Sequence, residues 1–170
     1  MSDHLIQKLP LDKGLKIESF IKKHNISITL KKNSGKTLSK IHKVSFPRHW
    51  TESYFNSLID HPNYKIFSAS NENTIRFLII LTTKDISEII TFAILPQMRR
   101  QGIGKALLTK SIEWLISKNF SYYNLEVSAE NITAQKLYKT LGFIQVGIRK
   151  NYYKSQIQRS DALLYTKKLK

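Results

Sequence analysis

Glycine and basic residues between positions 99 and 105 form the stretch of this sequence best suited to binding phosphate. They follow an apolar, strand-like run and precede a helical pattern, so a strand, a turn and a helix start meet there. The first N–H groups of a helix have no partner within the helix, and the helix dipole adds partial positive charge. Gly102 and Gly104 lack a Cβ, so an anion can approach the backbone, and Arg99, Arg100 and Lys105 add full charge. Taken alone, the pattern is also typical of an ordinary helix start packed on two small residues.

The elements that must position this stretch are strands and helices in mixed order. Alternating apolar residues predict strands at 26–30, 64–69, 74–81, 88–95, 121–127, 143–149 and 162–168. Asn33-Ser34-Gly35 predicts a turn over 32–36. Helical spacing predicts helices from Leu38 to Pro47, after a Thr51 cap, from Arg99 to Asn119, and from an Asn131 cap to Leu141 with Gly142 just beyond. This order indicates an α+β fold around one mixed sheet.

Composition limits the classes of protein to which the chain can belong. Its 170 residues, 41% hydrophobic and 24% charged, suit a single globular domain. The absence of cysteine excludes disulfides, thiolate catalysis and cysteine-based metal sites, and the five histidines lack ligand spacing, so no metal is expected. No signal peptide or membrane-spanning stretch is visible. We therefore expect a cytoplasmic protein that does not contact a membrane.

The net charge of +16 is distributed unevenly along the chain. Residues 1–50 hold eleven Lys or Arg against three acidic residues, and residues 145–170 hold seven against Asp161 alone. The middle of the chain, with ten basic and eight acidic residues, is nearly balanced. Basic ends favour polyanionic partners such as the phosphates of a cofactor or RNA. A genome that favours lysine codons would produce the same excess, and both explanations stay open.

Four sequence blocks together resemble those of one enzyme family. In chain order they are Phe46-Pro47-Arg48-His49-Trp50-Thr51; Ala93-Ile94-Leu95-Pro96 followed by Arg99-Arg100-Gln101-Gly102-Ile103-Gly104; Leu125-Glu126-Val127 continuing through Asn131 to Leu141-Gly142-Phe143; and Arg149-Lys150-Asn151-Tyr152-Tyr153 followed by Asp161-Ala162. They resemble the GNAT superfamily of N-acetyltransferases, and within it the ribosomal-protein-alanine N-acetyltransferase subfamily. The resemblance implies the GNAT fold, a central mixed, mostly antiparallel sheet flanked by helices. It covers residues 26–170 as one domain and leaves residues 1–25 as an N-terminal extension without an assigned role.

The same resemblance assigns roles to individual residues. It implies acetyl-CoA as co-substrate, bound by Phe92, Ala93, Ile94, Arg100, Gln101, Gly102, Ile103, Gly104, Lys105 and Asn131. Glu126 is the expected general base for the incoming amine, and Tyr138 the expected general acid for the departing thiolate. Without the resemblance, Glu126 would be interpreted as a solvated strand residue and Tyr138 as a core aromatic. The chain departs from the subfamily at Ser128, where Arg is usual, and at Leu95, where Asp commonly precedes the proline.

We therefore expect an acyltransferase that moves acetyl from acetyl-CoA to the N-terminal α-amine of a protein. The resemblance points to a small-subunit ribosomal protein, and the basic ends suggest association with the ribosome. One alternative is acetylation of a small amine, such as a polyamine or aminoglycoside, or of a protein lysine. Another is a non-catalytic GNAT-like domain that binds the ribosome or RNA, against which the presence of Glu126 and Tyr138 argues. The sequence leaves the oligomeric state open.

Overall fold

The computed structural model describes residues 19, 22, 26–30, 33–71, 74–154 and 159–170, so nearly all of the expected extension 1–25 lies outside it. Within these residues one seven-stranded sheet has the order β1-β2-β3-β4-β5-β7-β6. The strands are β1 (Ser27–Leu30), β2 (Tyr64–Asn71), β3 (Thr74–Thr83), β4 (Ile86–Ala93), β5 (Tyr122–Ser128), β6 (Ile144–Lys154) and β7 (Arg159–Lys168). Only β4 and β5 pair in parallel, and all other neighbours are antiparallel. The predicted mixed, mostly antiparallel sheet is confirmed.

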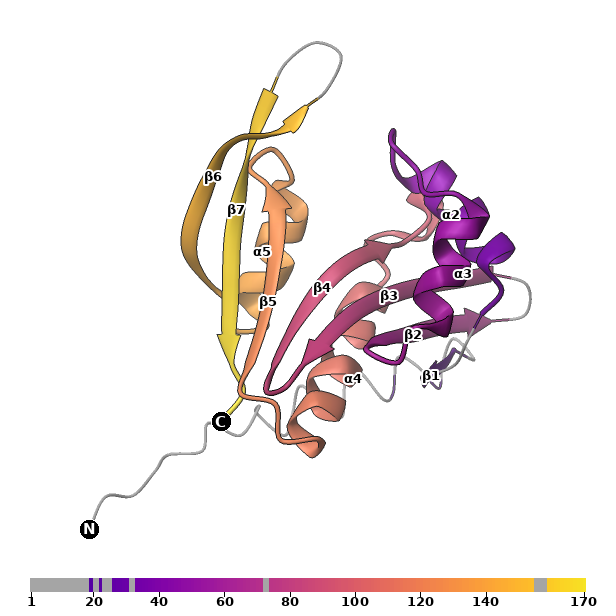
Figure 1. Cartoon of the computed structure of the whole chain (residues 1–170), viewed down its shortest axis with the longest axis horizontal. Coiled ribbons are helices and arrows are strands. Elements are labelled where there is room, and N and C mark those ends of the chain that lie inside the picture. Colours follow the sequence, from indigo (N-terminus) through magenta and orange to yellow (C-terminus); the bar gives the residue numbers. More distant parts are fainter. Residues whose placement is uncertain (1–18, 20–21, 23–25, 31–32, 72–73, 155–158) are drawn as a thin grey trace.

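Helices cover both faces of this sheet (Figure 1). They are α2 (Gly35–Ser45), α3 (Glu52–Asp60), the short 3-10 helix η1 (Pro96–Met98), α4 (Ile103–Ser117) and α5 (Ile132–Thr140). The side chains of Thr51 and Asn131 accept hydrogen bonds from backbone N–H groups in the first turns of α3 and α5, which confirms both predicted caps. Ser34 caps α2 in the same way. None of the helices in the described part of the chain is long and apolar enough to cross a membrane.

Alternation along the strands divides the buried side chains between two cores, one on each face of the sheet. One core joins α2 and α3 to a set of strand residues, namely Ile66, Phe77, Ile79 and Ala93. The other joins α4 and α5 to the opposite-facing set, Phe67, Leu78, Ile80, Ile89, Tyr123, Leu125 and Val127. Each fully buried aliphatic or aromatic side chain contributes roughly 1.5–3 kcal/mol to the free energy of folding. The two cores therefore fix the faces toward which site residues point.

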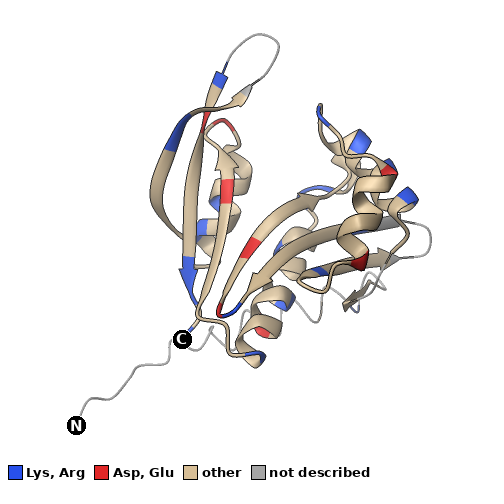
Figure 2. Cartoon of the chain, viewed as in Figure 1, with Lys and Arg blue, Asp and Glu red and all other residues tan. Residues whose placement is uncertain are grey.

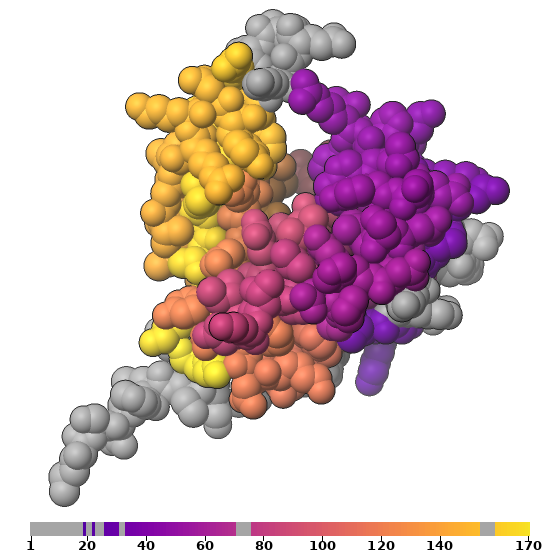
Figure 3. Space-filling model, in the orientation of Figure 1, coloured from indigo at the N-terminus to yellow at the C-terminus, as the bar shows by residue number. Residues whose placement is uncertain are grey.

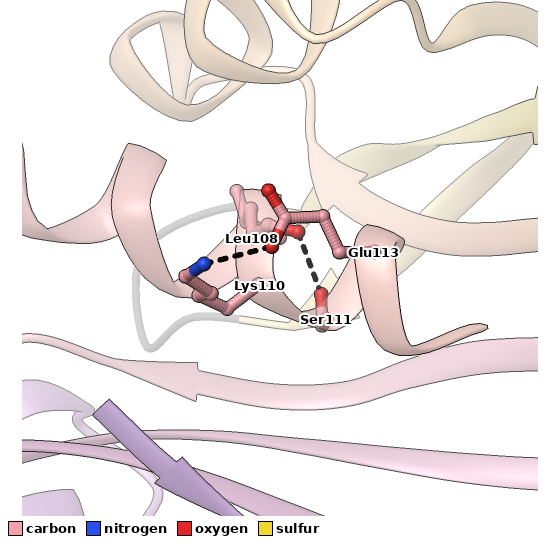
Figure 4. Close-up of polar contacts among 4 residues, drawn as sticks. All are labelled: Leu108, Lys110, Ser111 and Glu113. Atoms are coloured by element: carbon pink, nitrogen blue, oxygen red, sulfur yellow. Dashed lines mark hydrogen bonds and ion pairs between the residues drawn. The ribbon is translucent and has the colours of Figure 1, made fainter. Parts of the chain in front are cut away.

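Helix α4 has one side in the core and one side toward solvent, and Figure 4 shows polar contacts of both sides. Its inward-facing Ser111 is fully buried, and its hydroxyl donates to the carbonyl oxygen of Leu108 at 2.8 Å. The same hydroxyl lies 3.1 Å from the phenol oxygen of Tyr123 on β5. On the solvent side, Lys110 and Glu113 form an ion pair of 2.9 Å. The buried Ser111 hydroxyl is thus satisfied, and the helix is held against the strand that carries Glu126.

The structure corrects several predicted boundaries. Gly35 begins helix α2, so the predicted turn at 32–36 is in part a capped helix start. Helix α4 starts at Ile103 rather than Arg99, because Arg100 and Gly102 have left-handed φ values of 61° and 79°, which a right-handed helix does not accept. It ends at Ser117, before the predicted Asn119. Strands β6 and β7 extend beyond their alternating apolar segments because antiparallel pairing continues toward the hairpin end.

Candidate active site

Strands β4 and β5 diverge in the middle of the sheet (Figure 1). Their parallel ladder starts at Ile86 with Tyr122 and ends at Ile89 with Leu125. Beyond this point β4 continues to Ala93 paired with β3, while β5 continues to Ser128 paired with β7. Figure 3 shows the surface hollowed between the β6–β7 part of the molecule and the α2–α3 part. One edge of β4 is therefore open to an extended ligand that offers amide-like hydrogen-bonding groups.

A β-bulge in β4 lies where the two strands begin to separate. Ile79 of β3 pairs with Thr91, whereas the next residue, Ile80, pairs with Ile89, so Ile90 is an extra residue on β4. A bulge bends its strand and increases the local twist. The bend turns β4 away from β5, and the opening is therefore built into the backbone of β4.

The predicted phosphate-binding stretch lies at the end of β4. The guanidinium Nε of Arg99 donates to the carbonyl oxygen of Ile94 at 3.2 Å, which holds the turn against the strand end. Arg100 and Gly102 both have left-handed φ values, and the first turn of α4 follows, with Ala106 N–H donating to the Gly102 carbonyl at 3.0 Å. The N–H groups that precede Ala106 lie outside the intrahelical ladder. The arrangement is suited to binding an anion at the start of a fifteen-residue helix.

Gly104 has the packing role that the sequence left open as an alternative for the two glycines. A Cβ at this position would lie 2.9 Å from Cδ1 of Ile94, 3.3 Å from Cζ of Phe92 and 3.5 Å from Cδ2 of Leu137. The missing side chain therefore lets α4 approach the end of β4 and helix α5 closely. Gly102 differs, because it is exposed and adopts a left-handed backbone. The two glycines of the motif thus serve different purposes.

Glu126 points away from α5 and forms an ion pair with Arg149. Burial along β5 alternates, with Tyr123, Leu125 and Val127 buried in the α4–α5 core, so Glu126 faces the opposite side. Its Oε1 lies 3.0 Å from Nη1 of Arg149, with the two side chains 18% and 54% exposed respectively. The predicted base is thus only slightly accessible to solvent, and it is engaged by a cation.

A second carboxylate, Glu88 of β4, lies close to this ion pair. Glu88 is paired in register with Asn124 of β5, two residues before Glu126, and shares its face of the sheet. Figure 2 shows acidic positions on β4 and β5, near the place where the strands part. Burial raises the pKa of Glu88 above its ordinary value, the Glu126 carboxylate raises it further, and the Arg149 guanidinium opposes both. The site therefore combines two carboxylates with one guanidinium.

Tyr138 lies on the other face of β5, in the core formed by α4 and α5. It is 6% exposed, and its ring packs against Phe143 and Tyr165 at centroid distances of 5.8 and 6.5 Å. Burial raises the pKa of Tyr138 well above its ordinary value, and Tyr153 of β6 adds to this effect. Tyr138 therefore keeps its proton at neutral pH, as a proton donor must.

Tyr153 connects the two predicted catalytic residues electrostatically. Burial, then Glu126 and then Tyr152 raise the pKa of Tyr153 to about 12. Because Tyr153 also acts on Tyr138, its phenol lies within range of both groups. The structure does not place Glu126 and Tyr138 in contact. It places them on opposite faces of β5. The pKa of Tyr153 is raised by Glu126, and Tyr153 in turn raises the pKa of Tyr138.

Asn131 already uses one of its side-chain atoms within the fold. Its Oδ1 accepts the N–H of Ala134 at 3.1 Å, and the residue is exposed at the start of α5. Buried Gln135 holds the same turn, because its Nε2 donates to the carbonyls of Ser128 and Ala129 at 3.1 and 2.9 Å. The Nδ2 group of Asn131 remains the part of this side chain that could donate to a ligand.

Two further observations concern other kinds of site, namely a separate hollow and a metal centre. A hollow of about 300 Å³ near the end of α3 is lined by Leu30 and by residues 59–62 and 64–66. It contains none of the predicted site residues. It therefore offers none of the groups to which the chemistry is assigned. Among the residues that the structure describes, no group of three or more His, Cys, Asp or Glu residues could hold a metal ion.

Comparison with known families decides what kind of protein has this site. The model of the acetyltransferase (GNAT) family matches residues 36–143, which is more than half of the chain. The chain belongs to the GNAT family. It is therefore an acetyl-CoA-dependent N-acetyltransferase, as the resemblance predicted.

Relatives of this GNAT enzyme include bacterial enzymes with a named acceptor. The [ribosomal protein bS18]-alanine N-acetyltransferase of Escherichia coli is 33% identical over 120 residues, which is 71% of this chain and 80% of that protein. The enzyme of the same name from Haemophilus ducreyi is 43% identical over 85 residues, 50% of this chain and 59% of its own.

Solved structures of GNAT proteins resemble the chain along most of its length. The crystal structure of the ribosomal-protein-S18-alanine N-acetyltransferase from Escherichia coli aligns with a TM-score of 0.80 and 28% identity, covering 85% of this chain and 94% of that one. Arabidopsis thaliana NAA60 in complex with acetyl-CoA aligns with a TM-score of 0.72 and 20% identity, covering 84% and 98%. The second likeness shows a shared fold.

The geometry of this GNAT enzyme fits the chemical parts of acetyl-CoA. A pyrophosphate matches the start of α4, where N–H groups, the helix dipole and the exposed, left-handed Gly102 meet. An extended arm with amide groups matches the open edge of β4 beyond Ile89. The predicted cofactor-binding residues Phe92 to Ile94 and Arg100 to Lys105 lie along this path. Their individual roles remain predictions.

Sequence reasoning did not single out Glu88 or Arg149 in this GNAT site. Glu88 carried a signal, because it is the only charged residue in the apolar strand Ile86–Ala93. Arg149 and Tyr153 lie in one of the blocks that resemble the subfamily. The block did not indicate the contact of Arg149 with Glu126, because that contact depends on a strand order that places β7 between β5 and β6.

Proposed function

We propose that this GNAT enzyme acetylates the N-terminal α-amine of a protein, and that the acceptor is a small-subunit ribosomal protein of the bS18 type. The similarity to the Escherichia coli enzyme named for the alanine of bS18 carries the proposal, because it extends over 71% of this chain at 33% identity. The likeness in structure, with a TM-score of 0.80, supports it. Ribosomal proteins are cytoplasmic in bacteria, so we propose the same location for this enzyme.

Glu126 is the proposed general base. An α-amino group has a pKa of about 8, so roughly nine tenths of it is protonated at pH 7, and only the neutral form attacks a thioester. A carboxylate within reach of the ammonium, directly or through one water, can accept its proton. Glu126 lies at the opening between β4 and β5 with 18% of its side chain exposed. That limited exposure favours contact with a bound amine over contact with bulk water.

Tyr138 is the proposed general acid. When bound, acetyl-CoA supplies the acetyl group as a thioester. Backbone N–H groups of β4 beyond the bulge are available to donate to a carbonyl oxygen that gains charge. The phenol of Tyr138 keeps its proton at neutral pH because it is buried, and it can pass that proton to the departing sulfur. Glu126 and Tyr138 would then work from the two faces of β5, one on the amine and one on the leaving group.

The acceptor chain would enter through the hollow between α2–α3 and β6–β7 (Figure 3). Tyr152 and Tyr153 of β6 are 49% and 37% exposed, and they would offer the acceptor flat apolar surfaces with hydrogen-bonding hydroxyls. The basic ends of the chain would assist by attraction to ribosomal RNA. We propose residues 26–170 as the catalytic domain and residues 1–25 as an extension that adds to this basic charge.

Mass spectrometry of intact ribosomal proteins tests the proposal. Ribosomes from cells with and without the enzyme are compared, and loss of one acetyl group from the N-terminus of one small-subunit protein is the expected result. Restoring the enzyme should restore the group, whereas the Glu126→Gln enzyme should restore little of it. An unchanged set of ribosomal masses would refute the proposed acceptor. Acetylation of a polyamine by the purified enzyme would then direct attention to small amines.

A further inference from the structure

Arg149 occupies the place beside Glu126 that an incoming cation needs. The distance between its Nη1 and Oε1 of Glu126 is 3.0 Å. The acceptor amine reaches the enzyme as an ammonium ion for the most part, and it too must approach the Glu126 carboxylate. Two cations would therefore compete for one carboxylate. This competition is the starting point of the inference, which rests on the proposed role of Glu126.

The contact can be broken without moving the backbone. Arg149 on the edge strand β6 is paired with Ala162 of β7, which is in turn paired with Ser128 of β5. The arginine side chain therefore reaches diagonally across β7 to Glu126, which is paired with Leu164 of β7. Because the arginine side chain is 54% exposed, rotation about its own bonds is enough to withdraw it.

The guanidinium has a second partner beside Glu126 in the same position. The Cζ atom of Arg149 lies 5.4 Å from the centre of the Tyr152 ring, within the range of a cation–π contact. Tyr152 is itself half-exposed and packs edge-on against Tyr153 at 5.2 Å. When it leaves Glu126, Arg149 keeps a favourable partner at the entrance of the site.

The charges around Glu126 favour replacement of Arg149 by the acceptor ammonium over the binding of both cations at once. Glu88 and Glu126 supply two carboxylates, and Arg149 neutralises one of them. If Arg149 withdraws when the ammonium arrives, the total charge near Glu126 is unchanged and the carboxylate is free to accept a proton. Glu88 keeps the site attractive to a cation throughout.

We propose that Arg149 is a positioning residue that holds Glu126 in the free enzyme and gives up its place to the acceptor's ammonium group. Acceptor binding is then an exchange of one cation for another at the same carboxylate. The exchange favours acceptors that carry a positive charge on the amine to be acetylated. Its cost is limited, because the Arg149 side chain is 54% exposed and keeps the Tyr152 ring as a partner.

The test compares the KM for an alanine-terminated acceptor peptide among three variants. Arg149→Met keeps an unbranched apolar side chain and removes the competing cation, so the KM should fall about two- to five-fold. Arg149→Lys keeps a cation and should restore a KM near that of the parent. Lys150→Met removes an equal charge from the neighbouring exposed position and should leave the KM unchanged. If Arg149→Met does not fold, as judged by thermal unfolding, Arg149→Gln replaces it.

A peptide that is already acetylated separates this effect from a general change in the groove. It carries no ammonium, so its inhibition constant should be the same for the parent and for Arg149→Met. A raised or unchanged KM for Arg149→Met, or a parallel fall in that inhibition constant, would overturn the proposal. A parent enzyme that does not acetylate the peptide refutes the proposed function instead. The KM comparison is then made with the amine that the parent does acetylate, because the inference concerns the ammonium group alone.

Discussion

Replacing Glu126 with glutamine removes the proposed proton acceptor and keeps the size and shape of the side chain. The fold should survive, because the Arg149–Glu126 ion pair joins two partly exposed strands and such pairs contribute about 0–1 kcal/mol. Turnover should fall more strongly. General base catalysis typically contributes about 10² to 10⁴ in rate, or roughly 3–5 kcal/mol of barrier. Stability and activity should therefore respond to this one change by very different amounts.

The pH dependence of the Glu126→Gln enzyme is the most informative readout. Without a base, the rate should follow the fraction of neutral amine, which rises from roughly one tenth at pH 7 to nine tenths at pH 9 for a pKa of about 8. About ten-fold of the lost turnover should return over that interval. The assay is a pH–rate profile with an N-terminal peptide at saturating acetyl-CoA. Near-parent turnover at pH 7 would refute the assignment of Glu126 as base.

Glu88 is the control that this experiment requires. The Glu126 carboxylate is one of the causes that raise the pKa of Glu88, so its removal moves that pKa back toward the ordinary value. Glu88 shares the face of Glu126 on the sheet and could accept a proton in its place. The double variant Glu88→Gln/Glu126→Gln measures whether Glu88 acts as the base when Glu126 is absent. If it is no slower than Glu126→Gln alone, Glu88 provides no substitute route.

Three further predictions follow from the site and its support. Tyr138→Phe should lower turnover about 10²- to 10⁴-fold without rescue at high pH, because its defect lies in the leaving group; near-parent turnover would contradict this. Gly102→Glu should weaken acetyl-CoA binding at least about ten-fold in calorimetric titration, because it adds negative charge and a strained left-handed side chain, whereas Gly102→Asn should bind within a few-fold of the parent. Burial lowers the pKa of His42 to about 4, so its contribution to stability is complete above pH 6.5 and is lost as the pH falls toward 4. In urea unfolding, the free energy of unfolding of the parent should be about 2 kcal/mol lower at pH 5 than at pH 7.5. The difference should be smaller in His42→Gln and the same as in the parent in the control His61→Gln, whose histidine is exposed.

Much of the fold was predictable because burial follows simple periodicities. Strand β5 is an example, since Tyr123, Leu125 and Val127 alternate with polar residues and do enter the core. The caps Thr51 and Asn131 were also predictable, because their side chains accept bonds that the helix leaves unmade. The loop before α4 was not, because the left-handed backbone of a residue such as Arg100 has no compositional signal.

The site was predictable only where the chain resembles a known family. Glu126 and Tyr138 were chosen because they lie in matching blocks, and their roles remain untested predictions. The grouping of Glu88 with Arg149 could not be read from the sequence, since these residues are 61 positions apart and meet through the order of the strands. The stacking of His42 between Phe46 and Trp50, at ring-centroid distances of 4.3 and 4.8 Å, likewise depends on tertiary packing.

The early end of the β4–β5 ladder has a consequence for the exchange of backbone hydrogens with solvent. Amides of β4 beyond Ile89 that point toward β5 have lost their ladder partner, while the opposite edge of the strand stays bonded to β3. In the free protein, amides along that edge should exchange with deuterium faster than their neighbours that point toward β3. A ligand that occupies the open edge would slow exchange there and leave the β3 side unchanged. Strand β4 thus contains an internal reference against which occupancy of the opening can be measured.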